Sequence, residues 1–373
     1  MKKIVFLTGT RADYGKIKSL MKKIESSKEF ELYIYVCGMH LLEKYGSTHL
    51  EIRKDGFKNI YLSNQIKKYT KNDIALSENI KYFSEYIDII KPDMIFIHGD
   101  RIEAMAGAIV GLFNNIYVSH IEGGELSGTL DESIRHSVTK LSHFHFVAND
   151  NAKTRVIQLG EREENIFVVG SPDIDIMNSK KLPTLEQVKE KYEIDYEDYS
   201  ILLFHPVTTE LSSLEADVNC LMSALEKSNY NYIVIYPNND PGTEIILNRY
   251  KKTSSNHFKF FPSIRFEYFL SLLKNSHFVI GNSSAGIREC GFYGIPSINI
   301  GTRQNGRANL KLQKNIQNID FSDNEIMNAI IKINNFKNKD TYYGSGNSDE
   351  QIYQVLINNK IWDSSIQKQF RDL

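Results

Sequence analysis

Residues 94–103 read MIFIHGDRIE, an apolar run that is followed at once by charged side chains. The run Met94–His98 is short and rich in Ile and Phe, which favours a buried strand, and Ile102–Phe113 has the apolar spacing of a helix. Asp100 and Arg101 lie in the turn between them. A strand, a polar turn and a helix form one βα unit, and the fold follows from how often this unit recurs.

The same alternation recurs along the whole chain. In the first half we expect strands at Lys3–Thr8, Leu32–Cys37, Met94–His98, Ile116–Ser119, Phe144–Ala148 and Ile166–Val169. After Ser171-Pro172-Asp173 a second set follows, at Ile201–Phe204, Tyr232–Tyr236, Phe258–Phe260, Phe278–Ile280 and Ser297–Ile300. Two successive βα arrays predict an α/β protein with two doubly wound, Rossmann-like parallel sheets. Ligands of such sheets bind outside the carboxyl ends of the strands, so we expect two domains that face each other across one cleft.

The composition is that of an ordinary globular protein, with 24% charged and 41% hydrophobic residues among 373. Lys and Arg total 45 against 46 for Asp and Glu, which argues against nucleic acid or an anionic membrane as the main partner. The apolar run near Met1 is too short for a signal peptide, and no stretch of about 18 apolar residues exists. We therefore expect a cytoplasmic protein without a membrane partner. Three cysteines without a CxxC pattern exclude a disulfide scaffold and a Cys-rich zinc site.

The turn after the first expected strand, residues 8–16, contains a glycine and precedes a helix. Such a turn can present backbone N–H groups to an anion, and Arg11, Ala12 and Lys16 belong to it. An ordinary solvated helix start is the alternative. The GxGxxG and GxxxxGK[ST] patterns are absent from the sequence, so we expect neither an NAD-binding turn nor a P-loop kinase.

Ionisable residues follow later strands of the first half in the same way. Asp100 lies beside His98 and Arg101, although a simple helix N-cap is an alternative role for it. Glu122 follows the next strand, and the glycine pair Gly123-Gly124 lets the backbone approach a ligand closely.

A helix is expected to begin near Asp131, with Arg135 one turn further on. Acidic residues there can also serve only to favour the helix N-terminus. His143 and His145 alternate along one strand and share a face. We expect them to pack rather than to bind zinc, because no further ligands stand at a suitable spacing.

The strongest anion-binding pattern is residues 281–289, which lie between a strand and a helix. Small residues there, Ser283 and Ser284 among them, leave N–H groups and hydroxyls for a diphosphate at the positive end of the helix. Glu289 can accept hydrogen bonds from ribose hydroxyls, and a plain capped helix is the alternative. Arg303, after the next strand, can neutralise the same phosphates.

Two further residues of the second half follow strands. His205 can bind phosphate or act as an acid, and a purely structural histidine is the alternative. Asn238 lies in a turn, residues 236–242, whose amides can contact a base or a ribose.

These motifs together resemble a known family. The segments IHGDR, HIEGGE, SIRH, GSPD, FHPVTTE, YPNND, GNSSAGIRE and GTRQ are similar to those of the hydrolysing UDP-N-acetylglucosamine 2-epimerases of sialic acid biosynthesis, over essentially the whole chain. The resemblance implies the two-domain glycosyltransferase-B fold. It assigns residues 1–175 to a domain that carries the catalytic acids, 176–360 to a domain that binds UDP, and 361–373 to a C-terminal helix that crosses back.

The resemblance also implies an activity, the conversion of UDP-N-acetylglucosamine and water into N-acetylmannosamine and UDP through 2-acetamidoglucal. The C2 hydrogen of the sugar is not acidic, so a positioned base must remove it while UDP leaves from C1. Because C2 inverts, the proton returns on the opposite face, and at least two ionisable groups are needed.

By the same resemblance, Asp100, Glu122 and Asp131 share the base, acid and water-activating roles, and His205 joins the catalytic set. The residues expected on the UDP side are His205, Arg11, Ala12, Asn238, Ser283, Ser284, Glu289 and Arg303. Those expected to contact the sugar or the phosphates are Lys16, His40, His98, Arg101 and Arg135. No metal and no redox cofactor is implied, and a homodimer or homotetramer is expected.

Other functions remain open at this point. The same chemistry can act on a 2,4-diacetamido-2,4,6-trideoxy sugar linked to UDP or GDP, for legionaminic-type acids. A non-hydrolysing epimerase would leave its product attached to UDP. A glycosyltransferase or a non-catalytic nucleotide-sugar sensor would use the same fold for other purposes.

Overall fold

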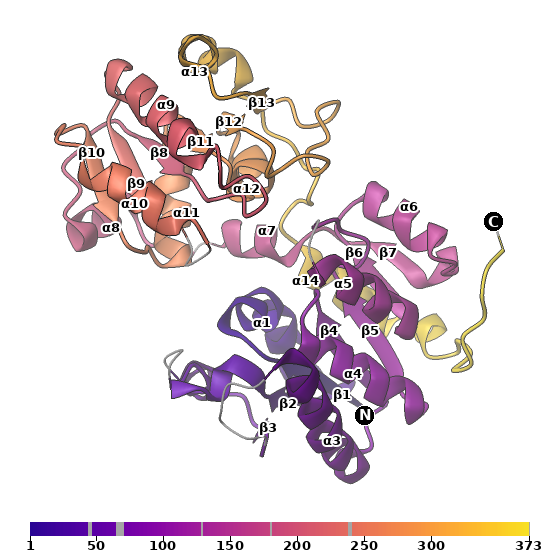
Figure 1. Ribbon diagram of the computed structural model, residues 1–373. Coiled ribbons are helices and arrows are strands. Elements are labelled where there is room, and N and C mark those ends of the chain that lie inside the picture. The colour runs from indigo at the N-terminus through magenta and orange to yellow at the C-terminus, as the bar shows by residue number, and fades with distance from the viewer. Residues whose placement is uncertain (44–46, 65–70, 128–129, 180, 238–240, 373) are drawn as a thin grey trace. The chain divides into compact units, whose positions relative to one another are not determined.

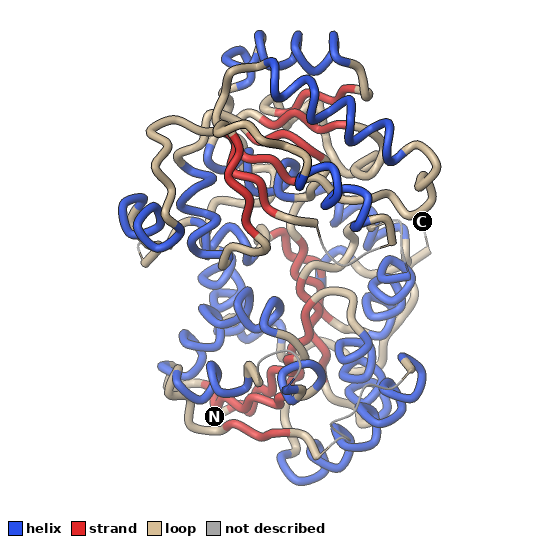
Figure 2. Tube along the Cα trace, turned by 60° about the vertical axis from the view of Figure 1, so that its left-hand side comes forward, coloured by secondary structure: helices blue, strands red, loops and turns tan. Residues whose placement is uncertain are grey.

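The computed structural model of the protein describes residues 1–43, 47–64, 71–127, 130–179, 181–237 and 241–372. The chain forms two compact units, Met1–Ile176 with Gly344–Leu373, and Met177–Tyr343 (Figure 1). Each unit holds one parallel sheet, and in Figure 2 the strands of each sheet, in red, lie between helices in blue. The expected α/β class with two doubly wound parallel sheets is confirmed.

The sheet of the first unit has seven strands in the order β3-β2-β1-β4-β5-β6-β7. They are β1 Lys2–Thr8, β2 Phe30–Val36, β3 Ile60–Leu62, β4 Met94–His98, β5 Tyr117–Ile121, β6 Phe144–Val147 and β7 Ile166–Val168. The helices are α1 Arg11–Ser26, α2 His49–Lys54, α3 Asn72–Ile90, α4 Ile102–Phe113, α5 Leu130–Leu141, α6 Asp150–Gln158 and α7 Pro172–Met177. The strand order reverses between β1 and β4, and that switch point is where doubly wound sheets bind ligands.

The sheet of the second unit has six strands in the order β10-β9-β8-β11-β12-β13. They are β8 Ser200–Leu203, β9 Tyr232–Ile235, β10 Phe258–Phe261, β11 Val279–Gly281, β12 Ser297–Ile300 and β13 Ile316–Ile319. The helices are α8 Leu185–Tyr192, α9 Leu214–Lys227, α10 Thr243–Lys251, α11 Phe266–Lys274, α12 Ala285–Tyr293 and α13 Asp323–Ile331. Its switch point lies between β8 and β11. Among the described residues, no helix is both long and apolar enough to cross a membrane.

The sequence pattern missed two strands, β3 and β13, and both lie at a sheet edge. An edge strand is short and is covered less than a central strand, so it need not form a continuous apolar run. In β13, Gln317 and Asn318 interrupt the apolar residues, and every residue of β3 is partly exposed.

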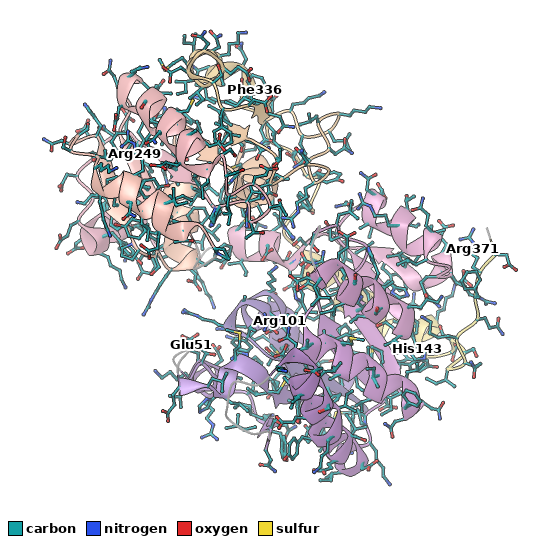
Figure 3. The ribbon with its side chains drawn as sticks, in the orientation of Figure 1. Glu51, Arg101, His143, Arg249, Phe336 and Arg371 are labelled. Carbon is teal, nitrogen blue, oxygen red and sulfur yellow. The ribbon has the colours of Figure 1, made fainter. Side chains whose placement is uncertain are left out.

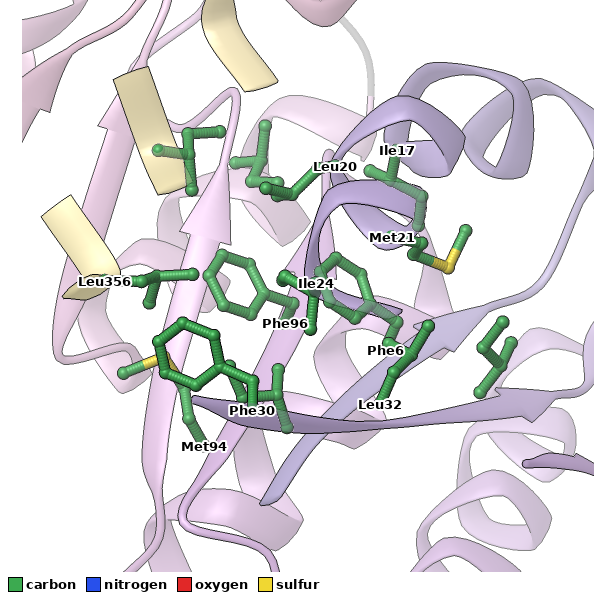
Figure 4. Packing of buried hydrophobic residues seen from close by; sticks show 14 of the residues in the cluster. Phe6, Ile17, Leu20, Met21, Ile24, Phe30, Leu32, Met94, Phe96 and Leu356 are labelled. Carbon is green, nitrogen blue, oxygen red and sulfur yellow. The ribbon is translucent and has the colours of Figure 1, made fainter. Parts of the chain in front are cut away.

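The core of the first unit forms where α1 packs on the sheet (Figure 4). The apolar residues of α1 recur at helical spacing and are Ile17, Leu20, Met21 and Ile24. They face Phe6 of β1 and Phe96 of β4, whose stacked rings have centroids 4.8 Å apart. A Thr10–Asp13 capping box starts α1 directly after β1, so the core fixes where the turn that follows β1 lies.

The chain returns to the first unit at Gly344, earlier than we expected, and α14 (Ser348–Ile357) inserts Leu356 into the core of Figure 4. The helix that we expected over 361–373 is therefore a wrong assignment, because residues 362–372 form no helix. The physical reason is the spacing of apolar residues: Ile352 and Leu356 are four apart and both buried, whereas polar residues fill most of the later segment.

The C-terminal tail after Trp362 is held by the loops and strand starts of β5 to β7. The hydroxyl of Tyr117 donates to the carbonyl of Ser364 at 2.5 Å, and the ring of His143 donates to the carbonyl of Ile366 at 3.0 Å. Lys368 pairs with the buried Glu161 at 2.8 Å. Figure 3 labels His143 and, farther along the chain, Arg371 in this part of the first unit.

Glu161 is the charged group that this tail covers. Burial disfavours its charge, but the hydrogen bond from His145 and the nearby Lys368 outweigh the burial and lower the pKa of Glu161 to about 2. Lys140 adds a third contact at 2.8 Å. Glu161, His145, Lys140 and Lys368 therefore form a structural ion cluster before the start of β7. It lies at the amino-terminal ends of the strands, opposite their carboxyl ends.

Asp175 of α7 holds the returning helix in place. Its carboxylate accepts hydrogen bonds from the backbone N–H groups of Ser348 and Asp349, both at 2.9 Å, and from the Ser348 hydroxyl at 2.6 Å. The N-cap residue of α14, Asn347, makes no side-chain cap bond of its own. Asp175 therefore satisfies N–H groups at the start of α14 that the helix itself leaves open.

We predict that Asp175→Ala lowers the free energy of unfolding of the first unit by about 1–3 kcal/mol, because it leaves buried donors unsatisfied. Urea denaturation of the full chain, followed by circular dichroism, measures the change. Asp88→Ala is the matched control, since Asp88 is exposed on α3 and should change stability by less than about 0.5 kcal/mol. Equal effects of the two substitutions would contradict the capping role.

Candidate active site

The turn that follows β1 is closed by the side chain of Asp13. Its carboxylate accepts hydrogen bonds from the backbone N–H of Gly9 at 3.0 Å, from the N–H of Thr10 at 3.2 Å and from the hydroxyl of Thr8. We expected these amides to be available to an anion, but Asp13 already occupies them. Arg11 and Ala12 are exposed at the start of α1, where Arg11 pairs with Glu51 at 3.1 Å.

His40 packs beneath the turn that follows β1 and contacts it through its ring nitrogens. Its Nε2 lies 3.0 Å from the Thr8 hydroxyl and its Nδ1 lies 2.7 Å from the Thr48 hydroxyl. The ring is fully buried, and burial lowers the pKa of His40 to about 4, so the ring is neutral near pH 7. Both ring nitrogens are engaged within the chain, so His40 holds the turn, and its contact with a ligand stays a prediction.

Glu122 follows β5, and its side chain is only 5% exposed. Its carboxylate accepts a hydrogen bond from the Ser171 hydroxyl at 2.5 Å and one from Lys16 at 3.4 Å, and Nε2 of His98 lies 3.2 Å away. Its backbone has φ of 63°, a left-handed conformation that costs energy for a residue other than glycine. The strained backbone and the converging donors give this carboxylate one defined position.

Lys16 links Glu122 to a second buried carboxylate, Asp173, at 2.9 Å. Lys16 and His98 were expected from the sequence, whereas Ser171 and Asp173 were not expected as site residues. The available signal was the rule used for the other strands, because both residues follow the carboxyl end of β7.

Asp100 forms an ion pair with Arg135 of α5. The alternative that Asp100 is only an N-cap is wrong, because Arg101 occupies the N-cap position of α4 and that helix has no side-chain cap bond. Asp131 lies one helical turn before Arg135 and is exposed in the first turn of α5. The structure therefore brings Asp100 to the helix that carries Asp131.

Arg101 is half-exposed and pairs with Glu103 at 3.2 Å. Burial raises the pKa of Glu103, and the nearby Arg101 opposes that rise. Figure 3 labels Arg101 in the first unit.

We expected His143 and His145 to pack rather than to bind zinc. Both make structural contacts with the C-terminal tail or with the Glu161 cluster that the tail covers. His143 bonds the carbonyl of Ile366 and His145 bonds Glu161 at 3.1 Å. Within the part of the chain that the structure describes, no group of three or more His, Cys, Asp or Glu residues is placed to hold a metal ion.

In the second unit, Asn282 ties the two strands of the switch point together. Its side-chain oxygen accepts from the N–H of His205 and its side-chain nitrogen donates to the carbonyl of His205, both at 2.8 Å. Gly281 before it has φ of 135°, and a Cβ there would lie 2.0 Å from the carbonyl oxygen of Leu203. Only glycine fits this close approach, which places Asn282 and His205 at the same carboxyl edge.

The turn before α12 is held in place by the loop that follows β12. Arg303 and Gln304 both donate to the carbonyl of Asn282, at 3.1 Å and 2.9 Å. Ser284 is the N-cap of α12 without a side-chain cap bond, and the Ser283 hydroxyl accepts from the N–H of Ala285 at 3.3 Å. A nine-residue helix thus begins at this edge with two hydroxyls beside it.

Of the remaining expected residues, Glu289 lies in the described part of the chain and Asn238 does not. Glu289 is buried on α12. A small pocket lies beside His205 and Asn282 and reaches Gly301 after β12. Asn238 lies outside the described residues. Asn282 and Gln304 were not expected as site residues, although they belong to the GNSSAGIRE and GTRQ motifs.

Doubly wound sheets with polar clusters at their switch points are typical of α/β enzymes that bind nucleotides. The sequence profile of the UDP-N-acetylglucosamine 2-epimerase family matches residues 22–357. The chain belongs to this family, which confirms the resemblance of its motifs.

Named relatives and a solved structure agree with the family. The chain is 48% identical to a UDP-N-acetylglucosamine 2-epimerase of Neisseria meningitidis serogroup B, with 100% of both proteins covered. It is 34% identical to the hydrolyzing UDP-N,N'-diacetylbacillosamine 2-epimerase of Legionella pneumophila, over 95% of this chain and 96% of that protein. The crystal structure of a UDP-GlcNAc 2-epimerase from Neisseria meningitidis bound to UDP-GlcNAc has a TM-score of 0.80, at 17% identity, over 96% of this chain and 100% of that one. This likeness shows a common fold.

We predict that the first unit loses stability as the pH falls from about 7 to 5. His40, His120 and His143 are buried there, and burial lowers their pKa values to about 4, 3 and 4. The unfolded chain binds protons on histidine from about pH 6.5 downward, whereas the folded chain does not until about pH 4. Each histidine then lowers the free energy of unfolding by up to about 1.4 kcal/mol per pH unit in that window.

Urea denaturation at a series of pH values measures this slope. His143→Gln, which keeps a donor for the carbonyl of Ile366, should reduce the slope by about one proton. A slope that is zero, or that is unchanged in the variant, would contradict the neutral state of these rings.

Proposed function

We propose that the protein is a hydrolysing 2-epimerase that converts UDP-N-acetylglucosamine and water into N-acetylmannosamine and UDP, for sialic acid biosynthesis. The observation that carries this proposal is a pair of carboxylates held separately on neighbouring strand ends. Glu122 is fixed by Ser171 and Lys16, and Asp100 pairs with Arg135. β4 and β5 pair in parallel with His98 opposite Ile121, so Asp100 and Glu122 leave the sheet at the same edge.

In the first half of the proposed reaction, one of these groups removes the proton from C2 as UDP departs. The C2–H electron pair becomes the C1=C2 double bond of 2-acetamidoglucal, and the C1–O bond breaks with its electrons on UDP. In the second half, water adds its oxygen to C1 and a proton enters C2 from the other face. One carboxylate does not serve both faces of a ring, which fits two carboxylates with different partners. Elimination and hydration balance without a metal or a redox cofactor.

Neutralising the departing UDP is the task we assign to the second unit. The N-terminus of α12 with Ser283 and Ser284 supplies N–H and hydroxyl donors, and Arg303 and His205 lie on the neighbouring loops. Fixed donors that meet developing negative charge are an effective way to lower a barrier, because they need no reorganisation. Glu289 is the expected ribose acceptor.

A second substrate is favoured by one observation, the 34% identity to a hydrolyzing epimerase named for UDP-N,N'-diacetylbacillosamine. The C1 and C2 chemistry is the same for a 2,4-diacetamido-2,4,6-trideoxy sugar, and only the groups at C4 and C6 differ. Comparing the turnover of both UDP sugars, and of the GDP sugar, with one enzyme preparation decides between them.

We predict that incubation with UDP-N-acetylglucosamine in heavy water yields free N-acetylmannosamine with deuterium at C2, because the returning proton comes from solvent. Mass spectrometry measures the label, and phosphorus NMR measures the release of UDP. A product still attached to UDP would identify a non-hydrolysing epimerase. A free product without deuterium would exclude the elimination mechanism.

We predict that Glu122→Gln lowers kcat by about 10²- to 10⁴-fold, the usual contribution of a general acid or base. Glu161→Gln is the matched control, because Glu161 is an equally buried glutamate in the same unit, also paired with a histidine and lysines. It should lower stability and leave kcat within about threefold of the wild type. A similar loss of kcat in both variants would show that folding, and not chemistry, had been damaged.

A further inference from the structure

His120 lies in β5, two residues before Glu122, and its side chain is fully buried. Nε2 of its ring is 2.8 Å from the carbonyl oxygen of Gly99, and Nδ1 is 3.1 Å from the hydroxyl of Thr139. A carbonyl oxygen only accepts, so Nε2 carries the hydrogen. Burial lowers the pKa of His120 to about 3, so the ring is neutral, and its Nδ1 accepts a hydrogen bond from Thr139.

These two hydrogen bonds join three segments that the proposed reaction uses. Gly99 immediately precedes Asp100. Thr139 is on α5, at positions i+4 and i+8 from Arg135 and Asp131, so the three side chains share one face of that helix. His120 itself is on the strand that ends before Glu122.

We propose that His120 is a positioning residue that holds the segments bearing Asp100, Glu122 and Asp131 in register. It acts through the carbonyl of Gly99 and the hydroxyl of Thr139. The inference rests on the proposed function for the roles of the carboxylates, and on the geometry alone for the link between their segments.

The glycine after Glu122 is a second, independent sign of this link. A Cβ on Gly123 would lie 2.9 Å from the Thr139 hydroxyl oxygen and 3.0 Å from Nδ1 of His120. The space that a side chain would need is thus filled by the His120–Thr139 hydrogen bond. In the HIEGG segment, His120 makes the hydrogen bond to Thr139, Gly123 leaves the space for it, and the strained Glu122 lies between them.

Loss of the imidazole would leave the Gly99 carbonyl without its ring donor. It would also remove one of the links between α5 and the loop that carries Asp100, while the Asp100–Arg135 ion pair would remain. A displacement of about 1 Å in a catalytic group commonly costs about 10²-fold in rate. The two half-reactions need different groups. A shift between the segments that carry these groups therefore slows elimination and hydration to different extents. Elimination then proceeds without matched hydration, and 2-acetamidoglucal escapes.

The test compares His120→Gln with His145→Gln in the full-length protein. His145 pairs with His120 in register across β5 and β6 and is equally buried, but it bonds Glu161 at the other edge of the sheet. Each variant is measured for kcat, KM, melting temperature and the fraction of turnovers that release 2-acetamidoglucal. Thr139→Val removes the hydroxyl at nearly constant volume, and Thr139→Ser restores it.

We expect His120→Gln to lower kcat by about 10- to 100-fold with KM changed by less than about threefold, and to release 2-acetamidoglucal. Thr139→Val should show the same pattern more weakly, Thr139→Ser should recover most of the activity, and His145→Gln should lose stability only. If the His120 and His145 variants lose kcat in the same proportion to their loss of melting temperature, the positioning role of His120 is overturned. It is also overturned if Thr139→Ser is as impaired as Thr139→Val.

Failure of the proposed function would be visible in the wild type, before any variant is compared. A wild type that exchanges the C2 hydrogen with heavy water and keeps its product on UDP would be a non-hydrolysing epimerase. The His120 comparison would then be made on the rate of C2 exchange, with the same expected order of variants. The two conclusions are therefore decided by separate measurements.

Discussion

The first unit is organised around one electrostatic constraint, the burial of the Glu122 carboxylate. A charged group removed from water is tolerated only when donors and counter-charges replace its hydration. Here these come from α1 and from the segment after β7, in the form of Lys16 and Ser171, and His98 at the end of β4 lies 3.2 Å away. Residues more than 150 positions apart in the chain must therefore meet at one point. A parallel sheet makes this possible, because it brings all of its strand ends to one edge.

The second unit meets a different need at its own switch point, where an arginine and side-chain amides hold backbone groups in place. The side chain of Asn282 bridges to the backbone of His205 after β8, and Arg303 and Gln304 donate to the carbonyl of Asn282. The result is a rigid turn at the start of α12 that keeps its hydroxyls at the edge of the sheet. The two switch points thus differ in chemistry: buried carboxylates with defined partners in the first unit, and backbone and side-chain dipoles with Arg303 in the second.

The fold was largely predictable because central parallel strands are buried on both faces and appear as short apolar runs. The rule that polar residues follow the carboxyl ends of such strands placed Asp100, Glu122, His205 and Arg303 at those ends, where the structure has them. It did not show which partners they would choose. That Asp13 closes the turn after β1, that His40 is buried beneath it, and that Ser171 contacts Glu122 all depend on tertiary contacts between distant segments.

Other parts were hidden for related reasons. Edge strands such as β13 carry polar residues because one of their sides is open, and local sequence does not distinguish them from loops. The return of the chain at Gly344 was misplaced because the partner of α14 is Asp175, more than 170 positions earlier. Asn282 was overlooked because an asparagine in a turn usually has only a local role, whereas this one bridges two strands.

The division of the chain has a consequence for synthesis. The second unit, Met177–Tyr343, is inserted between two parts of the first, so its strands are complete while the first unit still lacks α14. A nascent chain that has emerged up to Tyr343 can close its second core but not its first, because Leu356 is still to come. The unit that holds the first strands of the chain is thus completed after the unit inserted into it, and the core beneath Asp100 and Glu122 is filled only once α14 has been made.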